Sequence, residues 1–256
     1  MSVRTDTATG RLAGKVAVVT GAGAGIGEAT AIAMAREGAR VVLADVLPDR
    51  VEALANRIAG DGGEVLSRPF DVTDDAAWPG FVQDVVERFG RIDALFNNAG
   101  GGSGKDGSVV DLDLDEFWRV VRVDLYGTLL GCRHVLPVMA EQRAGSVVNI
   151  ASLRAVMGTR GGDAYTAAKG GVLALSRALA VQWAEQGIRV NVLAPGVVLS
   201  ERVRAMIPPE DPIYRKMLLG PAEPADVAEL VVYLASDESR RMTGAVLRLD
   251  GGASAA

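Results

Sequence analysis

The chain has 256 residues, of which 49% are hydrophobic, and its formal net charge at pH 7 is -5. This length and apolar content suit one large α/β domain rather than two thin ones. The 27 lysines and arginines are scattered along the chain rather than clustered, which argues against a nucleic-acid or membrane partner and favours a small molecule.

Short β-branched segments alternate with longer segments of helical periodicity, a pattern that predicts a parallel sheet covered by helices on both faces. In chain order we expect strands at 16–20, 40–44, 64–67, 92–97, 146–150, 189–193 and 245–249, with helices between them at 25–37, 48–59, 74–89, 114–141, 164–186 and 224–234. The predicted fold class is therefore α/β, a doubly wound parallel seven-stranded sheet (Rossmann fold) in a single domain.

Local signals at the ends of the helices agree with this assignment. Gly38, Gly60, Gly90 and Gly187 each follow a helical run, where glycine favours a left-handed C-cap, and Thr73 stands where an N-cap is expected. Three irregular stretches, at 100–109, 153–163 and 197–220, follow the carboxyl ends of predicted strands. Open α/β sheets bind their ligands at that edge.

The cysteine content and the hydropathy pattern limit the cellular setting. The chain has one cysteine, Cys132, which has no partner for an intramolecular disulfide and no companion ligands with metal-site spacing. No segment reaches the ~18 apolar residues of a membrane helix, and residues 1–10 lack a signal-peptide core. We expect a cytoplasmic protein without a metal, with a flexible tail at 1–10 and one domain at 11–256.

The turn after the first predicted strand has the spacing of a dinucleotide-binding loop. Gly21, Gly25 and Gly27 stand between that strand and the first helix, so backbone N–H groups and the helix dipole converge on a point suited to a pyrophosphate. Asp45 ends the second strand, where a carboxylate accepts hydrogen bonds from the adenosine ribose and repels the 2′-phosphate of NADP. The sequence therefore predicts NAD as the cofactor.

Tyr165 and Lys169 are four residues apart in a predicted helix and lie on the same face of it. An ammonium group beside the phenol favours the ionised form of the phenol and makes Tyr165 a candidate proton-transfer group. This pair alone also fits an ordinary surface tyrosine over a solvated lysine. The glycine loop and the upstream Ser152 favour the catalytic interpretation.

Taken together, these motifs resemble the short-chain dehydrogenase/reductase family over about residues 15–252. They occur in the family's order: the loop at 20–27, Asp71-Val72, Asn97-Asn98-Ala99-Gly100, Ser152, Tyr165 with Lys169, Pro195-Gly196 and Asp250-Gly251-Gly252. The resemblance implies that the segment at 71–72 contacts the adenine, that 98–100 run along the cofactor, and that 195–198 lie beside the nicotinamide amide. The predicted cofactor-binding residues are Gly21, Gly25, Ile26, Gly27, Asp45, Asp71, Val72, Asn98, Ala99, Gly100, Tyr165, Lys169, Pro195, Gly196, Val198 and Ser200.

The resemblance implies an NAD-dependent oxidoreductase that interconverts a secondary alcohol and a ketone by hydride transfer. Ser152 would hydrogen-bond the substrate oxygen, Tyr165 would act as general acid and base, and Lys169 would hold the nicotinamide ribose and stabilise the tyrosinate. The resemblance also implies a homotetramer that is built through the long helices. It further implies a substrate lid near 197–220. Two alternatives stay open: a 3-oxoacyl thioester reductase, and an NAD-binding sensor or scaffold with weak catalysis.

The sequence departs from the family's pattern at two positions. Ser200 replaces a common threonine and keeps the hydroxyl group, whereas Asp124 replaces an asparagine that helps to hold a water near the catalytic lysine. An ionised Asp124 near Lys169 would offset the effect of the ammonium on Tyr165, so we expect an alkaline-shifted activity optimum. The alternative is that Asp124 makes a local helix hydrogen bond and has no effect on catalysis.

Overall fold

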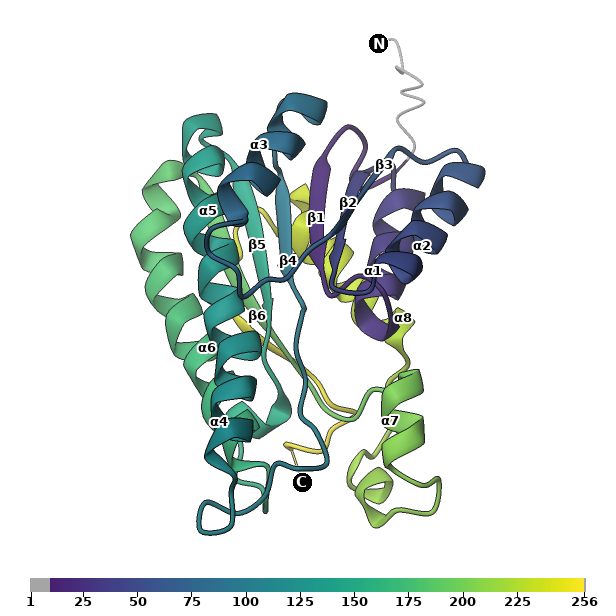
Figure 1. Ribbon diagram of the computed structural model, residues 1–256, viewed down its shortest axis with the longest axis vertical. Helices are drawn as coiled ribbons and strands as arrows, with labels where there is room; N and C mark the ends of the chain where they lie inside the picture. The colour runs from purple at the N-terminus through teal and green to yellow at the C-terminus, as the bar shows by residue number, and fades with distance from the viewer. Residues whose placement is uncertain (1–9, 256) are drawn as a thin grey trace, which may run out of the picture.

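Seven parallel strands form the central sheet of the computed structural model, which describes residues 10–255 (Figure 1). The strands are β1 (Val16–Thr20), β2 (Arg40–Asp45), β3 (Val65–Pro69), β4 (Ala94–Asn97), β5 (Gly145–Ile150), β6 (Ile188–Pro195) and β7 (Val246–Leu249). Their order is β3-β2-β1-β4-β5-β6-β7, which confirms the predicted seven-stranded, doubly wound sheet. The tail expected at 1–10 lies outside the described residues, apart from Gly10.

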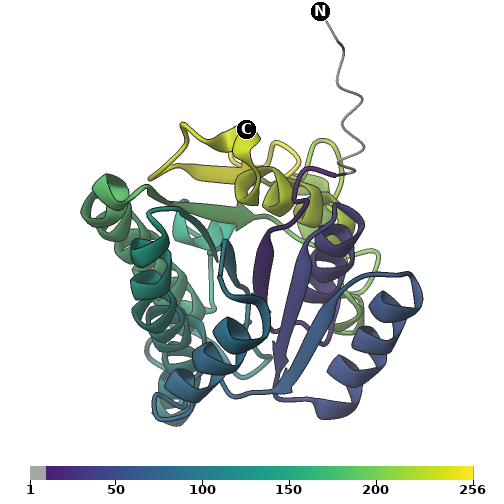
Figure 2. The same ribbon diagram turned by 90° about the horizontal axis from the view of Figure 1, so that it is seen from above.

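Helices cover both faces of this sheet (Figures 1 and 2). They are α1 (Gly25–Arg36), α2 (Pro48–Gly60), α3 (Trp78–Phe89), α4 (Leu114–Val120), α5 (Gly127–Gln142), α6 (Asp163–Trp183), α7 (Glu201–Met206) and α8 (Pro224–Ala235). Short turns of 3₁₀ helix lie at η2 (Leu153–Ala155), η3 (Ala184–Gln186), η4 (Pro212–Lys216) and η5 (Asp237–Ser239). The helices α1, α2 and α8 cover one face, and α3 to α6 cover the other.

The two faces of the sheet carry two separate hydrophobic cores. Alternate residues of a strand point to opposite faces, and β1 shows this directly because Ala17 and Val19 belong to one core while Val16 and Val18 belong to the other. All four side chains are fully buried. The strands are therefore continuous apolar runs, as a sheet covered on both faces requires.

The long helix expected at 114–141 is interrupted, which corrects the prediction. A π-helical segment, η1 (Val121–Tyr126), separates α4 from α5 and carries Asp124 at its centre. Such segments occur frequently at functional sites. Hydrophobic periodicity could not detect this segment, because the partly buried Phe117, Val121 and Leu125 keep a helical spacing of four residues through it.

Three smaller expectations also need correction. Gly60 is the last residue of α2 rather than a left-handed cap, and Gly62 has the positive φ of 86°. Thr73 does not cap α3, because the helix begins at Trp78 after Ala77. The helix α7 lies within the stretch at 197–220 that we expected to be irregular.

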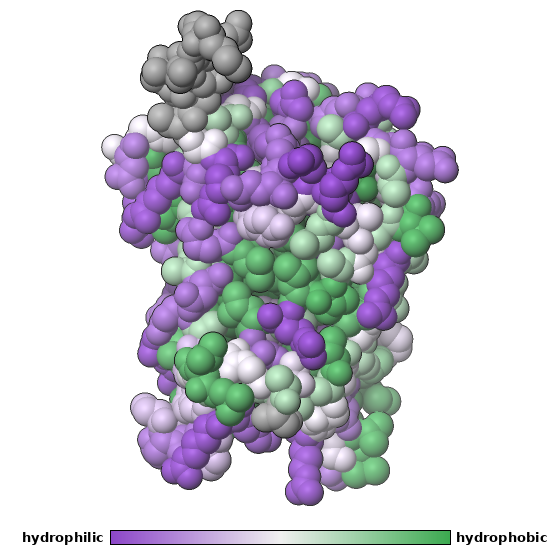
Figure 3. Space-filling model, turned by 180° about the vertical axis from the view of Figure 1, so that it is seen from behind, coloured by the Kyte–Doolittle hydropathy of each residue, from purple (hydrophilic) through white to green (hydrophobic). Residues whose placement is uncertain are grey.

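The surface is not evenly polar. Figure 3 shows apolar side chains near the middle of the back face, with hydrophilic side chains above them and along the edges. Several large apolar side chains are solvent-exposed, among them Val181 and Leu219. Within residues 10–255 no helix combines the length and the apolar character that crossing a bilayer requires.

Candidate active site

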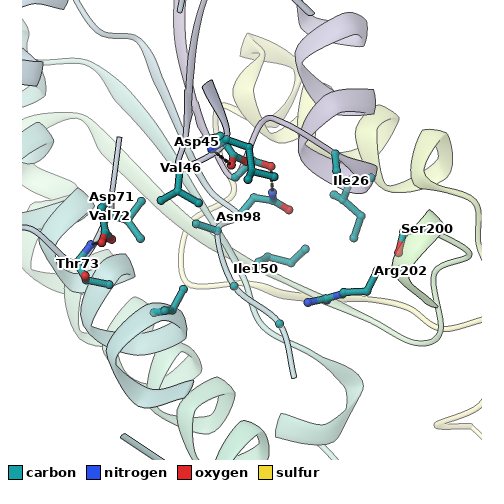
Figure 4. Close-up of a pocket in the computed structure, with 18 of the residues that line it drawn as sticks. Ile26, Asp45, Val46, Asp71, Val72, Thr73, Asn98, Ile150, Ser200 and Arg202 are labelled. Carbon is teal, nitrogen blue, oxygen red and sulfur yellow. Dashed lines mark hydrogen bonds between the residues drawn. The ribbon is translucent and has the colours of Figure 1, made fainter. Parts of the chain in front are cut away.

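A cleft of about 730 Å³ opens at the carboxyl edge of the sheet, on the side of the molecule where α4 and α7 face each other in Figure 1. Twelve of the predicted site residues line it: Gly21, Gly25, Ile26, Asp45, Asp71, Val72, Asn98, Ala99, Gly100, Tyr165, Lys169 and Ser200. They follow five different strands or stand on α6, and Figure 4 shows how several of them surround one space. The sheet topology therefore brings the sequence motifs together.

Two positions of the turn from β1 into α1 leave no room for a side chain. A Cβ at Gly27 would collide with the carbonyl oxygen of Gly21, and a Cβ at Gly21 would lie 2.8 Å from the Cα of Ala99. Ala24, the N-cap of α1, has no side-chain acceptor for the first N–H groups of the helix. Those N–H groups suit the phosphate oxygens of a dinucleotide.

Asn98 fixes the shape of this loop. Its amide nitrogen donates hydrogen bonds to the carbonyl oxygens of Thr20 and Gly21, both at 3.0 Å. The hydroxyl of Thr20 in turn accepts from the backbone N–H groups of Asn98 and Ala99. The side-chain amide of Asn98 therefore joins the segment after β4 to the glycine loop and stabilises this part of the cleft wall.

Asp45 is fixed at the end of β2 by two backbone hydrogen bonds. Its carboxylate accepts from the N–H of Gly23 at 2.9 Å and from the N–H of Leu47 at 3.0 Å. The nearby Arg50 forms an ion pair with Glu201, 3.4 Å away. A negative charge thus faces the cleft, and the closest guanidinium group is already paired with another carboxylate.

Tyr165 and Lys169 lie together on α6, as their spacing predicts. The Nζ atom of Lys169 lies 5.6 Å from the centre of the Tyr165 ring and donates to the carbonyl oxygen of Ile150 at 3.0 Å. Burial acts to lower the pKa of Lys169, but the negative charge of Asp124 and the adjacent phenol raise it, and the net shift is upward. Lys169 therefore carries a positive charge although only 2% of it is exposed.

Asp124 forms the other half of a buried ion pair. One carboxylate oxygen lies 3.0 Å from Nζ of Lys169, and both oxygens accept the N–H of Gly101, at 2.9 and 3.1 Å. The backbone carbonyl of Asp124 accepts from the hydroxyl of Thr128. The carboxylate therefore contacts the lysine and the loop after β4 rather than the backbone of its own helix.

The remaining predicted residues stand beside the cleft without lining it. Ser152 follows β5 as the N-cap of η2, and its hydroxyl accepts the N–H of Arg154 at 3.2 Å, while η2 contacts α6. Gly196 packs against the backbone of Asp250. Gly27, Asp124, Pro195 and Val198 are likewise outside the cleft wall. The predicted contacts of these residues with substrate or cofactor stay predictions.

Several residues of the cleft wall were not anticipated from the sequence: Val46, Leu47, Thr73, Gly101, Arg119, Arg122, Val123, Ile150, Ala151, Glu201, Arg202 and Ala205. Most of them stand next to a recognised motif, so adjacency could have indicated them. Adjacency to Ser200 could have indicated Glu201 and Arg202, but only the folding of the 197–220 segment brings Arg202 and Ala205 to the cleft wall.

The chain is similar to known proteins over most of its length. A family model described as enoyl-(acyl carrier protein) reductase matches residues 21–254. Levodione reductase of Leifsonia aquatica is 38% identical, with 98% of both chains covered, and a crystal structure of levodione reductase superimposes with a TM-score of 0.88 over 96% of this chain and 99% of the other. Trans-4-hydroxycyclohexanecarboxylate dehydrogenase of Sinomonas cyclohexanicum is 39% identical, covering 96% of this chain and 95% of its own. The 3-oxoacyl-(acyl-carrier-protein) reductase FabG of Thermotoga maritima is 36% identical, and the match covers 94% of this chain and 98% of FabG.

Proposed function

The chain belongs to the short-chain dehydrogenase/reductase family of oxidoreductases, and on this premise we propose that it interconverts a secondary alcohol and a ketone with NAD as its cofactor. The observation that carries the proposal is the convergence of Tyr165, Lys169 and Asp45 on one cleft that begins at the glycine loop.

In the proposed reaction, Tyr165 exchanges a proton with the substrate oxygen. The buried ammonium of Lys169, beside the phenol ring, stabilises the phenolate form electrostatically. Ser152, at the start of η2 next to α6, donates a hydrogen bond to the same substrate oxygen. A bound dinucleotide would supply the redox chemistry, with NAD as hydride acceptor for alcohol oxidation and NADH as hydride donor for ketone reduction.

The preference for NAD over NADP rests on the charge at the end of β2. Asp45 is held by the N–H groups of Gly23 and Leu47, so its carboxylate cannot easily turn away from a bound adenosine ribose. The following side chains, Val46 and Leu47, are exposed and apolar, and Arg50 is paired with Glu201. The guanidinium group nearest to Asp45 is therefore already paired with a carboxylate.

We propose a mid-sized alicyclic alcohol or ketone as the substrate class. Two relatives are named for hydroxylated alicyclic compounds, the hydroxycyclohexanecarboxylate dehydrogenase at 39% identity and a 3-alpha-(or 20-beta)-hydroxysteroid dehydrogenase of Mycobacterium tuberculosis at 41%. A screen for NADH formation across ring alcohols, polyols and hydroxyacyl thioesters tests this class.

Replacement of the proposed acid–base group tests the reaction itself. Tyr165→Phe should bind NAD as the unmodified protein does, while kcat falls by ~10²–10⁴-fold, because general acid–base catalysis contributes that much. Tyr126→Phe is the matched control, since it removes a phenolic hydroxyl from η1 outside the cleft wall. Equal turnover in the two variants would refute the assignment.

Two alternatives are distinguishable by the same assays. The FabG relative favours a 3-oxoacyl thioester reductase, which predicts reduction of an acyl thioester with NADPH preferred over NADH. The buried Asp124–Lys169 pair favours a weakly catalytic NAD-binding sensor or scaffold. That alternative predicts NAD binding without turnover on any alcohol or ketone of the panel.

We also propose a cytoplasmic homotetramer. Large apolar side chains are exposed on the three helices expected at the subunit interface, with Trp118 on α4 exposed at 61%, Leu129 on α5 at 38% and Val181 on α6 at 81%. Exposed apolar groups on adjacent helices are typical of protein interfaces.

The proposed cytoplasmic location rests on the single, buried cysteine.

A further inference from the structure

Arg202 reaches from α7 into the middle of the cleft, as Figure 4 shows. It lines the same cleft as Tyr165 and Lys169. A Cβ added at Gly101 would collide with both terminal nitrogens of Arg202, so the guanidinium group lies directly against the loop after β4. Because Gly101 has no side chain, this close approach is possible.

Three successive glycines of that loop each adjoin a different functional side chain. A Cβ at Gly100 would collide with the carboxylate of Asp124, one at Gly101 would collide with Arg202, and one at Gly102 would lie 3.7 Å from the ring of Tyr165. The guanidinium of Arg202 therefore lies along the same stretch of backbone as the proposed catalytic residues. It is also close enough to Lys169 to repel the ammonium electrostatically.

The positive charge of Arg202 is not balanced by a carboxylate among residues 10–255. Arg50 and Arg119, which also line the cleft, are paired with Glu201 and Glu116, and Arg204 of the same helix is paired with Glu223. Arg122 of the cleft wall, like Arg202, has no ion pair among residues 10–255. Asp124 is fully buried and engaged by Lys169 and Gly101. No hydrogen bond or ion pair of the Arg202 side chain is found in the described part of the chain.

We propose that Arg202 binds an anionic oxygen group of a ligand in the cleft, either the pyrophosphate of the dinucleotide or a carboxylate on the substrate. This inference rests on the proposed function and assigns a specificity-determining residue to it. A guanidinium group presents parallel N–H donors that match two oxygens of a carboxylate or a phosphate.

The position of α7 is compatible with both sources of the anion. Ser200, two residues before Arg202, lies against the glycine loop, because a Cβ at Gly25 would be 3.2 Å from the Cβ of Ser200. The guanidinium group, at the other end of a long side chain, lies against Gly101 beside the residue that adjoins Tyr165. The segment from Ser200 to Arg202 thus runs from the proposed phosphate site to the proposed substrate site.

The first arm of the test measures binding without turnover. The affinities of ADP-ribose, which contains the pyrophosphate, and of adenosine, which lacks it, are compared by calorimetry for the unmodified protein, Arg202→Leu and Arg202→Lys. If the pyrophosphate is the ligand group, Arg202→Leu weakens ADP-ribose binding by about tenfold, the scale of a hydrogen bond to a charged group. Adenosine affinity stays unchanged, and Arg202→Lys retains part of the binding because it keeps the charge.

The second arm measures turnover of a substrate pair that differs in charge. The kcat/KM values for 4-hydroxycyclohexanecarboxylate and for its methyl ester are compared in the same proteins. If a substrate carboxylate is the ligand group, Arg202→Leu lowers the acid-to-ester ratio of kcat/KM by about tenfold. The effect weakens in ~1 M NaCl, where the Debye length falls to ~3 Å.

Arg204→Leu is the matched control in both arms, because it removes the same charge from the same short helix but lies outside the cleft wall. A selective change in either arm for Arg202→Leu supports the proposal and identifies the anion. Unchanged ADP-ribose affinity together with an unchanged acid-to-ester ratio overturns it. Failure of the unmodified protein to bind ADP-ribose overturns the proposed cofactor site, and this inference with it.

Discussion

At the scale of single residues, the buried pair of Asp124 and Lys169 is the feature of the site that most needs a physical explanation. Removal of two charges from water is costly, and mutual attraction offsets this only with good geometry and further hydrogen bonds. Here the carboxylate accepts the N–H of Gly101 and the ammonium donates to Ile150. Because the pKa of Lys169 is raised, the pair stabilises the fold below pH 10.5 and loses this contribution as pH rises further.

Asp124→Asn should move the basic limb of the pH–rate profile to lower pH. The carboxylate raises the pKa of Lys169, so its loss lowers that pKa and also removes the negative charge that offsets the ammonium near Tyr165. An amide oxygen can still accept from Gly101, so the maximal rate should stay within about tenfold. The measurement is kcat against pH, with Asp111→Asn as an exposed, charge-matched control, and an unmoved basic limb contradicts the electrostatic argument.

Asp45→Asn should change the choice of dinucleotide. The amide keeps an oxygen for Leu47 N–H, which Asp45 now binds at 3.0 Å, but it no longer repels a 2′-phosphate. Because a like-charge contact costs several kcal/mol, the affinity for NADP should rise by about tenfold or more. Fluorescence titration with NAD and NADP measures this. Tight NADP binding by the unmodified protein would show that Asp45 does not select against the phosphate.

At the scale of the elements, the first turn of α6 is capped by a distant segment. Its N-cap, Gly162, has no side chain, and the carboxylate of Asp106 accepts the N–H groups of Ala164 and Tyr165, at 3.1 and 2.8 Å. In return, Asp163 accepts the N–H of Val109. The loop after β4 therefore fixes the turn that carries the proposed proton-transfer group.

Asp106→Ala should lower kcat more than it raises the KM for NAD. The change leaves two N–H groups without their acceptor, at a cost of ~0.5–2 kcal/mol for a lost cap, and releases the backbone of Tyr165. Asp106→Asn keeps one acceptor and should restore part of the rate. Steady-state kinetics and thermal unfolding are measured together. A lower Tm with unchanged kcat would assign Asp106 to stability alone.

At the scale of the whole molecule, the exposed apolar side chains of α4, α5 and α6 argue for assembly. The fold already buries two cores, one on each face of the sheet. Exposure of Trp118 and Val181 to water therefore does not stabilise the monomer. Burial against a second copy would recover apolar area at about 25 cal/mol per Å². α6 also carries Tyr165 and Lys169, so assembly and site geometry would be linked.

Val181→Glu should dissociate the proposed tetramer, since it places a charge in the middle of the expected interface. Light scattering coupled to size exclusion gives the mass directly. Ala53→Glu, at an exposed position of α2 on the opposite side of the sheet, is the matched control and should keep the assembly intact. A monomeric unmodified protein, or a Val181→Glu variant of unchanged mass, would contradict the proposal.

The sequence by itself determined the sheet, its strands and twelve residues of the cleft wall. Buried parallel strands are apolar runs, and glycine spacing is set by close backbone approach, so β1, Gly21 and Gly27 could be placed from local pattern. The relation of Tyr165 to Lys169 follows from helical periodicity alone. Each of these features depends on residues near one another in the chain.

Only the tertiary structure decided which groups from distant segments meet. The π-helical turn at η1 aims Asp124 at Lys169 and Gly101, the 197–220 segment folds so that Arg202 reaches the cleft, and Asp106 caps a helix that begins 57 residues later. Such contacts join groups with no fixed spacing, and the free energy of a buried charge depends on its partners rather than on its neighbours in sequence. For this reason periodicity and motif spacing located the site, whereas its electrostatics required the folded chain.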